Sequence, residues 1–175
     1  MTSLREVPVM VAPTFESYVA ERSVALQRFA YLVTHNVEDA RDLVQEALIG
    51  LYPRWASVAA TGTVEAYVRR SIVNAGISRW RKVRRLTSVA DPSELPWAPA
   101  TADPALAIAD ADEAWRLCAT LPPIQRAAVV MRFYEELSFT EIAEVLQIPP
   151  STARSHVHRA LATLRARLTK DTDDD

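Results

Sequence analysis

The sequence predicts an all-α protein made of two small helical domains joined by a proline-rich linker. Apolar residues recur at three- and four-residue spacing along most of the 175-residue chain, as they do on the buried side of helices. The chain contains only three glycines, and four of its 11 prolines cluster between residues 92 and 104. Proline lacks a backbone donor and stops regular helices, so this cluster separates two helical parts.

Three helices are predicted before the linker. Thr14 can cap a helix that runs to about Thr34. Asn36 can cap a second helix, which ends at Pro53, and Thr63 can cap a longer third one. The buried stripe of the second helix is predicted to contain Val37, Ala40, Val44, Ala47, Leu48 and Leu51. That of the third contains Tyr67, Val68, Ile72, Ala75 and Trp80.

The linker is predicted to cover residues 86–104. Proline-rich chains are stiff and extended, so this linker is expected to hold the two domains apart. The second domain, residues 105–170, is predicted to contain helices at 105–120, 123–135, 138–146 and 150–168. Residues 171–175 are expected to form a solvated acidic tail.

A helix-turn-helix is predicted within the second domain. The Ser138 hydroxyl can accept a hydrogen bond from the backbone of Glu141, whose carboxylate can reach back to the Ser138 N–H, as in a capping box. Leu137 and Ile142 fall at the two positions of a hydrophobic staple. A break of a few residues follows at 147–150, and the next helix starts with a proline, which a first turn tolerates.

The helix after this break is predicted to bury one face and to expose a cationic one. Its buried stripe contains Ala153, Val157, Ala160, Leu161, Leu164 and Leu168. Its outer face contains Thr152, Arg154, Ser155, His158 and Arg159. Such a face suits a helix that reads the major groove, because arginine offers paired donors to guanine O6 and N7. The alternative is a helical hairpin with a solvated basic face, but the capping box, the short turn and the single sign of charge together favour DNA binding.

The basic residues are unevenly distributed along the chain. The net charge is −2, yet 12 of the 20 Lys and Arg residues lie in two stretches that contain no acidic residue. Seven lie between Arg69 and Arg85, and five lie after Pro150. Such clusters are expected of a protein that binds a polyanion, whereas the acidic remainder suits contact with a basic protein surface.

Two groups of polar residues in the first domain are candidate binding sites. Asp42, Gln45 and Glu46 share the face of the second helix opposite its apolar stripe, which is either an ordinary solvated face or a docking surface. On the third helix Asn74 precedes a cationic end that contains Arg79, Arg81, Lys82, Arg84 and Arg85. This combination suits a site that holds a nucleic-acid backbone and handles an unstacked base.

Several classes of function are not expected. Cys118 is the only cysteine, so neither a disulfide framework nor a cysteine-based metal site is predicted. His156 and His158 are two residues apart and would point to opposite sides of a helix, so they cannot share a metal ion. No nucleophile with a base and no phosphate-binding glycine loop can be assembled, so no catalytic residue and no cofactor are predicted. The lack of a long apolar run or a secretion signal predicts a soluble cytoplasmic protein without membrane insertion.

The chain resembles the extracytoplasmic-function (ECF) sigma factors of bacterial RNA polymerase, in particular the actinobacterial SigE-like group. The resemblance extends from Phe15 to Leu168. It rests on four segments and on their order, namely Asp42 to Ala47, Ala66 to Asn74, Leu121 to Arg126, and the hairpin from Leu137 to Leu161.

This resemblance implies a sigma-2 domain at residues 1–85, a linker at 86–104 and a helix-turn-helix sigma-4 domain at 105–170. It implies a factor without catalytic activity of its own that binds core RNA polymerase and directs promoter-specific transcription initiation. The implied partners are the β′ coiled coil and the β flap of the polymerase, promoter DNA, and an anti-sigma factor, which such factors often have.

The resemblance also implies roles for individual residues. Asp42, Gln45 and Glu46 match the face that docks on the β′ coiled coil. Asn74 matches the asparagine that captures an unstacked base of the minus-10 element, and the cationic helix end after it would contact backbone phosphates. Arg154, Ser155, His158 and Arg159 match positions that enter the major groove of the minus-35 element. The chain departs from the family pattern at Gln147 and Ser151, which replace glycines, and at His156, which replaces a frequent arginine.

Two other functions fit parts of the pattern. An autonomous dimeric helix-turn-helix regulator would need a dimerisation surface and would bind duplex DNA unaided. A helical adaptor that binds only proteins would leave the two basic clusters unexplained. Comigration with core polymerase, and initiation on selected DNA, would separate the three functions.

Overall fold

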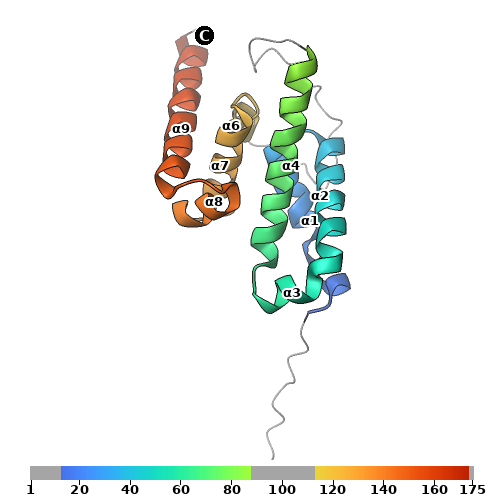
Figure 1. Cartoon of the computed structure of the whole chain (residues 1–175). Helices are drawn as coiled ribbons and strands as arrows, with labels where there is room; N and C mark the ends of the chain where they lie inside the picture. Colours follow the sequence, from blue (N-terminus) through green and yellow to red (C-terminus); the bar gives the residue numbers. More distant parts are fainter. Residues whose placement is uncertain (1–12, 88–112, 174–175) are drawn as a thin grey trace, which may run out of the picture.

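The computed structural model describes residues 13–87 and 113–173, which contain helices and no strand, so the all-α prediction is confirmed (Figure 1). The first domain contains α1 (Phe15–Thr34), α2 (Val37–Leu51), the 3₁₀ helix η1 (Tyr52–Arg54), α3 (Trp55–Ala60) and α4 (Val64–Thr87). The second contains α6 (Glu113–Cys118), α7 (Pro123–Phe133), α8 (Phe139–Leu146) and α9 (Pro150–Asp173). The predicted linker from residue 88 onward and the predicted helical residues 105–112 lie outside the described residues.

The predicted N-caps of the first two helices are confirmed. The Thr14 hydroxyl accepts a hydrogen bond from the Ser17 backbone N–H at 3.1 Å. The Asn36 side chain accepts one from the Asp39 backbone N–H at 3.0 Å. The sequence did not reveal η1 and α3, because helices of three and six residues are too short to show a periodic apolar stripe.

Helices α1, α2 and α4 enclose the core of the first domain. Its largest fully buried side chains are Phe29, Leu43, Leu51, Val68, Ile72 and Val73. Burying each of them stabilises the fold by roughly 1.5–3 kcal/mol. Leu43 and Val73 were not in the predicted stripes, because α2 and α4 each contact helices on more than one side and so bury a wider face than a single stripe.

The predicted capping box opens α8. The Ser138 N–H donates to Glu141 Oε2 at 2.8 Å, and the Glu141 N–H donates to Ser138 Oγ at 3.2 Å. The Ser138 hydroxyl also donates to Glu141 Oε2, at 2.7 Å. The backbone N–H of Ser138 and, to a smaller extent, this hydroxyl favour the ionised carboxylate and lower the pKa of Glu141. Helix α8 ends at Leu146 and is followed by Gln147, whose φ of 56° is a left-handed conformation that favours glycine. The turn that glycine usually makes is therefore made here by a strained glutamine.

Helix α9 packs on α7 and α8 through its N-terminal part, as far as Leu164. The predicted stripe residues that are buried or half-buried are Ala153, Val157, Ala160, Leu161 and Leu164. Leu168 is 51% exposed, so its predicted burial is wrong. With 24 residues α9 is roughly 36 Å long. Helix α7 has 11 residues, so the last turns of α9 extend beyond it and continue to Asp173, into the predicted tail.

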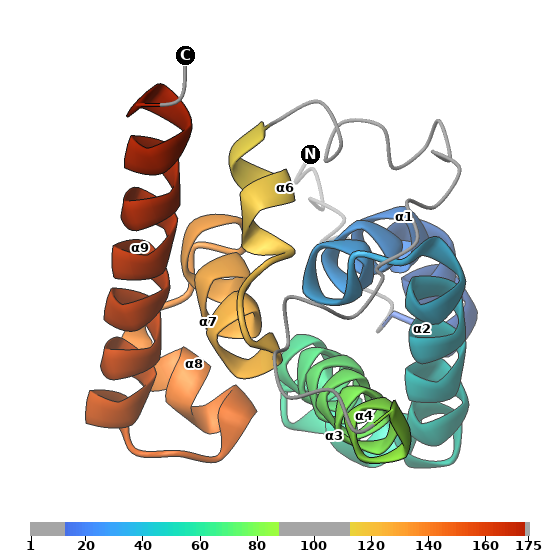
Figure 2. The same cartoon turned by 90° about the horizontal axis from the view of Figure 1, so that it is seen from above.

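The two domains pack against each other, so the expectation that the linker holds them apart is wrong. Helix α4 lies between α2 and the second domain and contacts α7 and α8, and α1 also contacts α7 (Figure 1 and Figure 2). Buried apolar residues of both domains form one continuous cluster. A stiff linker sets the reach of the chain, whereas the match between two facing surfaces decides whether domains pack.

A network of alternating charges crosses the boundary between the domains. Arg22 on α1 pairs with Glu65 on α4 at 2.8 Å, and Arg69, one turn further along α4, lies 3.5 Å from the Glu65 carboxylate. Arg69 also pairs with Glu135, which follows α7, and its Nε donates to Glu135 Oε2 at 2.7 Å. The Arg69 and Glu135 side chains are 15% and 14% exposed, so each charge depends on the other to replace lost water.

We expect Glu135→Lys to separate the domains. The substitution places a second cation against half-buried Arg69, and breaking one partner of a buried ion pair costs roughly 3–5 kcal/mol. Small-angle scattering should show a larger radius of gyration while the helical content is retained. Glu136→Lys changes the same charge at the exposed neighbouring residue and should leave the radius unchanged. Equal radii for Glu135→Lys and the wild type would show that the ion pair does not hold the domains together.

Candidate nucleic-acid interface and acidic docking face

The outer face of α9 is available to a ligand along one edge of the molecule. Arg154, Ser155, His158 and Arg159 are exposed, and Thr152 is half-buried. Helix α9 and helix α2 lie on opposite sides of the molecule in both views (Figure 1 and Figure 2). The predicted reading face is therefore exposed even though the two domains are in contact.

The angle between α8 and α9 is set by the turn that joins them. The backbone N–H of Ile148 donates to the Ala143 carbonyl at 3.0 Å, which closes the end of α8. The backbone N–H of Thr152 donates to the Pro149 carbonyl at 2.9 Å, which starts α9. Because the turn carries its own backbone hydrogen bonds, α9 is presented at a fixed angle, as a major-groove reader requires.

Two side chains of the predicted reading face, Arg154 and Ser155, contact other parts of the protein. The guanidinium of Arg154 lies over the Phe139 ring, with Cζ 5.1 Å from the ring centroid. The Ser155 hydroxyl donates to the Ser151 carbonyl at 2.9 Å, so its lone pairs remain available to a donor on a ligand. Both residues are thus held in place before any ligand binds.

The two histidines of α9 have different surroundings. His156 is half-buried, and burial, with a smaller contribution from Arg159, lowers its pKa. His158 is exposed on the outer face. Of the two, only His158 therefore lies on the predicted reading face.

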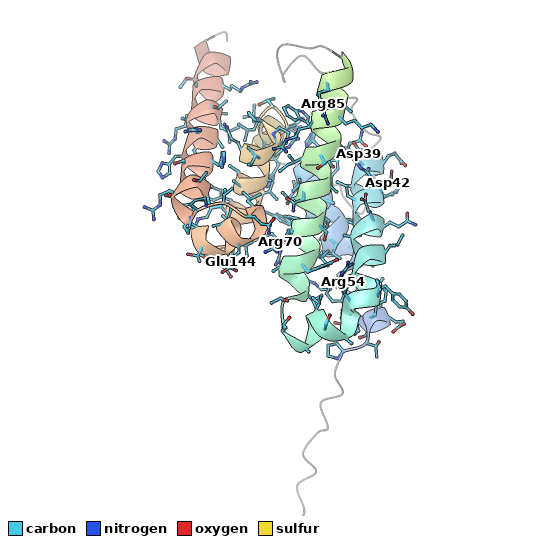
Figure 3. All side chains as sticks on the ribbon, in the orientation of Figure 1. Asp39, Asp42, Arg54, Arg70, Arg85 and Glu144 are labelled. Carbon is cyan, nitrogen blue, oxygen red and sulfur yellow. The ribbon has the colours of Figure 1, made fainter. Side chains whose placement is uncertain are left out.

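The far end of α4 carries a second cationic surface. Arg81, Lys82 and Arg85 are exposed, and Figure 3 places Arg85 near the end of the helix. Arg84 belongs to the same helix, but its side chain is outside the described residues. Asn74 is also exposed on α4, two turns before this cationic end. The structure therefore brings the predicted amide and most of the predicted cations onto one helix.

Arg79 is the exception among the predicted cations. Its guanidinium lies 3.4 Å from Asp39, 3.6 Å from Asp42 and 3.1 Å from Glu46, all on α2. The side chains involved are between 37% and 63% exposed, so water screens these pairs and each contributes little stability. Arg79 faces the acidic residues of α2 and could contact a phosphate only after leaving them.

The acidic docking face consists of Asp42, Gln45 and Glu46 on α2, which are all exposed. Figure 3 shows Asp39 and Asp42 on α2 beside α4, which carries their shared partner Arg79. The spacing predicted by the sequence thus places the three candidate residues on one surface, next to Arg79.

An apolar groove beside the acidic docking face was missed in the sequence. It has a volume of about 570 Å³ between α1 and α2 and is bordered by Gln45, Leu48, Ile49 and Tyr52. Ile49 and Tyr52 are 66% and 62% exposed and lie together at this groove, and exposed apolar residues that adjoin one another mark interaction sites. The sequence feature that could have indicated this groove is Ile49, an apolar residue three positions after Glu46 on the otherwise polar face of α2.

These features define an all-α protein of two packed domains, with a helix-turn-helix, two exposed cationic surfaces and a separate acidic face. No helix within residues 13–87 and 113–173 is both long enough and apolar enough to cross a bilayer.

Comparisons with known proteins identify the class further. The family model for sigma-70 region 2 matches residues 19–86, and the model for sigma-70, region 4 matches residues 111–164. The RNA polymerase sigma-E factors of Streptomyces avermitilis and Streptomyces coelicolor are 39% and 38% identical to this chain. Each alignment covers 88% of this chain, and they cover 84% and 85% of the two relatives. The chain belongs to the sigma-70 family of RNA polymerase sigma factors, within the ECF type.

A solved structure shows the same fold. It is that of the sigma factor RpoE in complex with the anti-sigma factor NepR from Bartonella quintana. The TM-score is 0.65 at 20% identity, and the alignment covers 89% of this chain and 96% of that chain. The similarity in fold therefore extends over both domains.

We expect Arg81→Ala and Arg79→Ala to differ in their effect on binding to duplex DNA. Loss of a phosphate contact at Arg81 should reduce the slope of log affinity against log salt by about 0.9. Arg79→Ala should reduce the slope less, because Arg79 must first give up its carboxylate partners on α2. Fluorescence anisotropy over a series of salt concentrations measures both slopes. A larger change for Arg79→Ala would show that Arg79 leaves α2 and becomes the main phosphate contact.

Proposed function

We propose that this chain binds core RNA polymerase and directs it to a specific class of promoters, for which it recognises minus-10 and minus-35 elements and assists melting. Sigma factors are transcription initiation factors, and we infer that this one has no catalytic activity of its own. The observation that carries the proposal is the match to both sigma-70 regions, in order, on a fold that presents two cationic surfaces and an acidic docking face. We infer that the protein acts in the cytoplasm, where its polymerase would be.

The acidic docking face is the proposed contact with the β′ coiled coil. Asp42, Gln45 and Glu46 offer carboxylates and an amide to a basic partner, and the groove beside them offers exposed Ile49 and Tyr52. An apolar centre with a charged rim is the usual anatomy of a specific protein interface. Contact with the β flap is proposed for the second domain, by resemblance to the family.

Promoter recognition is proposed to use both cationic surfaces. Arg154, Ser155, His158 and Arg159, with Thr152 at the helix start, would enter the major groove of the minus-35 element. Asn74 would hold an unstacked base of the minus-10 element. The proposed backbone contacts are Arg79, Arg81, Lys82, Arg84 and Arg85.

The two domains would have to separate before both elements are read. Elements about 25 base pairs apart lie roughly 85 Å apart along duplex DNA. In the structure the Arg70 guanidinium donates to the Glu144 carbonyl of α8 at 2.7 Å, which joins the helix-turn-helix to the helix that carries Asn74 (Figure 3). We therefore infer that the packed arrangement is a form of the protein that is not engaged with a promoter. An anti-sigma factor that binds such a form is a proposed further partner.

Reversing the acidic docking face should abolish binding to core polymerase. Asp42→Arg together with Glu46→Arg would repel a basic partner and also Arg79. Comigration with bacterial core polymerase on a sizing column, and transcription from selected promoters, measure the effect. Glu21→Arg together with Glu136→Arg changes the net charge equally at exposed residues elsewhere and should bind normally. Wild-type binding by the Asp42 and Glu46 double variant, with its fold intact, would overturn the assignment. Failure of the wild type itself to support initiation would overturn the proposed function.

Asn74→Ala should impair promoter opening while polymerase binding and closed complexes stay near normal. Unstacking a base costs a few kcal/mol and must be offset by contacts to that base. An amide can supply both a donor and an acceptor. Permanganate footprinting should show fewer open complexes, and a template with a pre-melted bubble should restore transcription. Ser78→Ala, at an exposed residue one turn further along α4, is the control. Normal opening with Asn74→Ala would mean that Asn74 has no role in melting.

A further inference from the structure

The ring of Phe139 joins three helices of the second domain through cations. Phe139 is the first residue of α8, and the Cζ atoms of Arg132 and Arg154 lie 5.0 and 5.1 Å from its ring centroid. Arg132 belongs to α7 and Arg154 to α9. A guanidinium within about 6 Å of an aromatic centroid is attracted to the negative face of the ring.

The Phe139 ring is a fixed platform. It is half-buried and packs against the main apolar cluster. The backbone that carries it is held by the capping box between Ser138 and Glu141. Arg132 is fixed as well, because its Nη1 donates to the Leu137 carbonyl at 2.9 Å. The ring position is therefore set by α7 and α8, independently of any ligand of α9.

Arg154 is the member of this group that a ligand of α9 can reach. It is exposed on the outer face of α9, and a long arginine side chain loses rotamer freedom when it makes paired hydrogen bonds to a base. A guanidinium that already rests on a ring has lost part of this freedom in the unbound protein. Its planar group keeps its N–H donors at the edge, so stacking and base contact can occur together.

We propose that Phe139 is a positioning residue for promoter recognition, which holds the Arg154 guanidinium on its ring in the orientation that reads the upstream element. The proposal rests on the proposed function of Arg154 as a base-reading residue. It predicts that Phe139 contributes to discrimination between sequences through Arg154, and not merely to the stability of α8.

The test uses full-length protein assembled with core polymerase, and a promoter selected by the wild-type holoenzyme. Discrimination is the ratio of affinities for this promoter and for versions with single base-pair changes in the upstream element. Phe139→Leu keeps an apolar side chain and removes the ring, and cyclohexylalanine at position 139 keeps the shape and removes the π-system. Both should lower discrimination at the base pair read by Arg154 by about two- to fivefold, or roughly 0.5–1 kcal/mol at 1.36 kcal/mol per tenfold. Phe139→Tyr should retain it.

A double-mutant cycle separates positioning from a structural role. In an Arg154→Ala background, Phe139→Leu should cause no further loss of discrimination, whereas in an Arg159→Ala background its effect should persist in full. Thermal melting of each variant measures stability, and any structural cost of Phe139→Leu should be the same in both backgrounds.

Each outcome bears on one claim. If Arg154→Ala leaves discrimination unchanged, the proposed role of Arg154 is wrong. If Arg154→Ala lowers discrimination but the cyclohexylalanine variant does not, or if the losses at the two positions add, Phe139 does not act through Arg154 and the inference is overturned. Improved discrimination without the ring would also overturn it, since the Phe139 ring would then compete with DNA for the Arg154 guanidinium.

Discussion

The arrangement of the described part of the molecule depends on α4, which packs within the first domain and against the second. One side of this helix completes the core of the first domain with Val68 and Ile72, and another carries Arg69 to its half-buried partner Glu135. Bringing both charges out of water is costly, and only their close approach and shared hydrogen bond offset that cost. The ion pair therefore adds little net stability, but it forms in only one arrangement of the domains and so selects that arrangement.

This constraint divides the basic residues of α4 into two groups. Arg69, Arg70 and Arg79 are directed at acceptors within the protein, namely Glu135, the Glu144 carbonyl and the carboxylates of α2. Nearer the end of the helix, Arg81, Lys82 and Arg85 are exposed. The charge count of the sequence therefore overstates the nucleic-acid footprint of the packed form. These three arginines form contacts within the protein and would become available to DNA only if those contacts were broken.

Local signals in the sequence predicted the fold well because they depend on neighbours a few residues away. The caps at Thr14 and Asn36 and the box at Ser138 are of this kind. Helical periodicity was less reliable at Leu168, since a stripe does not reveal where the partner helix stops. The packing of the domains was not predictable in this way, because Arg69 and Glu135 are 66 residues apart and nothing local marks them as partners. The candidate site residues were placed by family resemblance and helical spacing, but neither indicated that Ile49 and Tyr52 would flank an open groove.

The ion pairs of Arg79 and of Arg69 differ in strength, which suggests the order in which they would break. The pairs of Arg79 with Asp42 and Glu46 are exposed, and such pairs contribute about 0–1 kcal/mol each. A basic surface that approaches α2 can thus replace Arg79 at little cost. The Arg69–Glu135 pair is largely shielded from water, so separating it requires new partners or water for both charges at once. The proposed docking at α2 and the proposed separation of the domains would therefore be distinct steps. The second, which would free α8 from the helix that carries Asn74, would cost more.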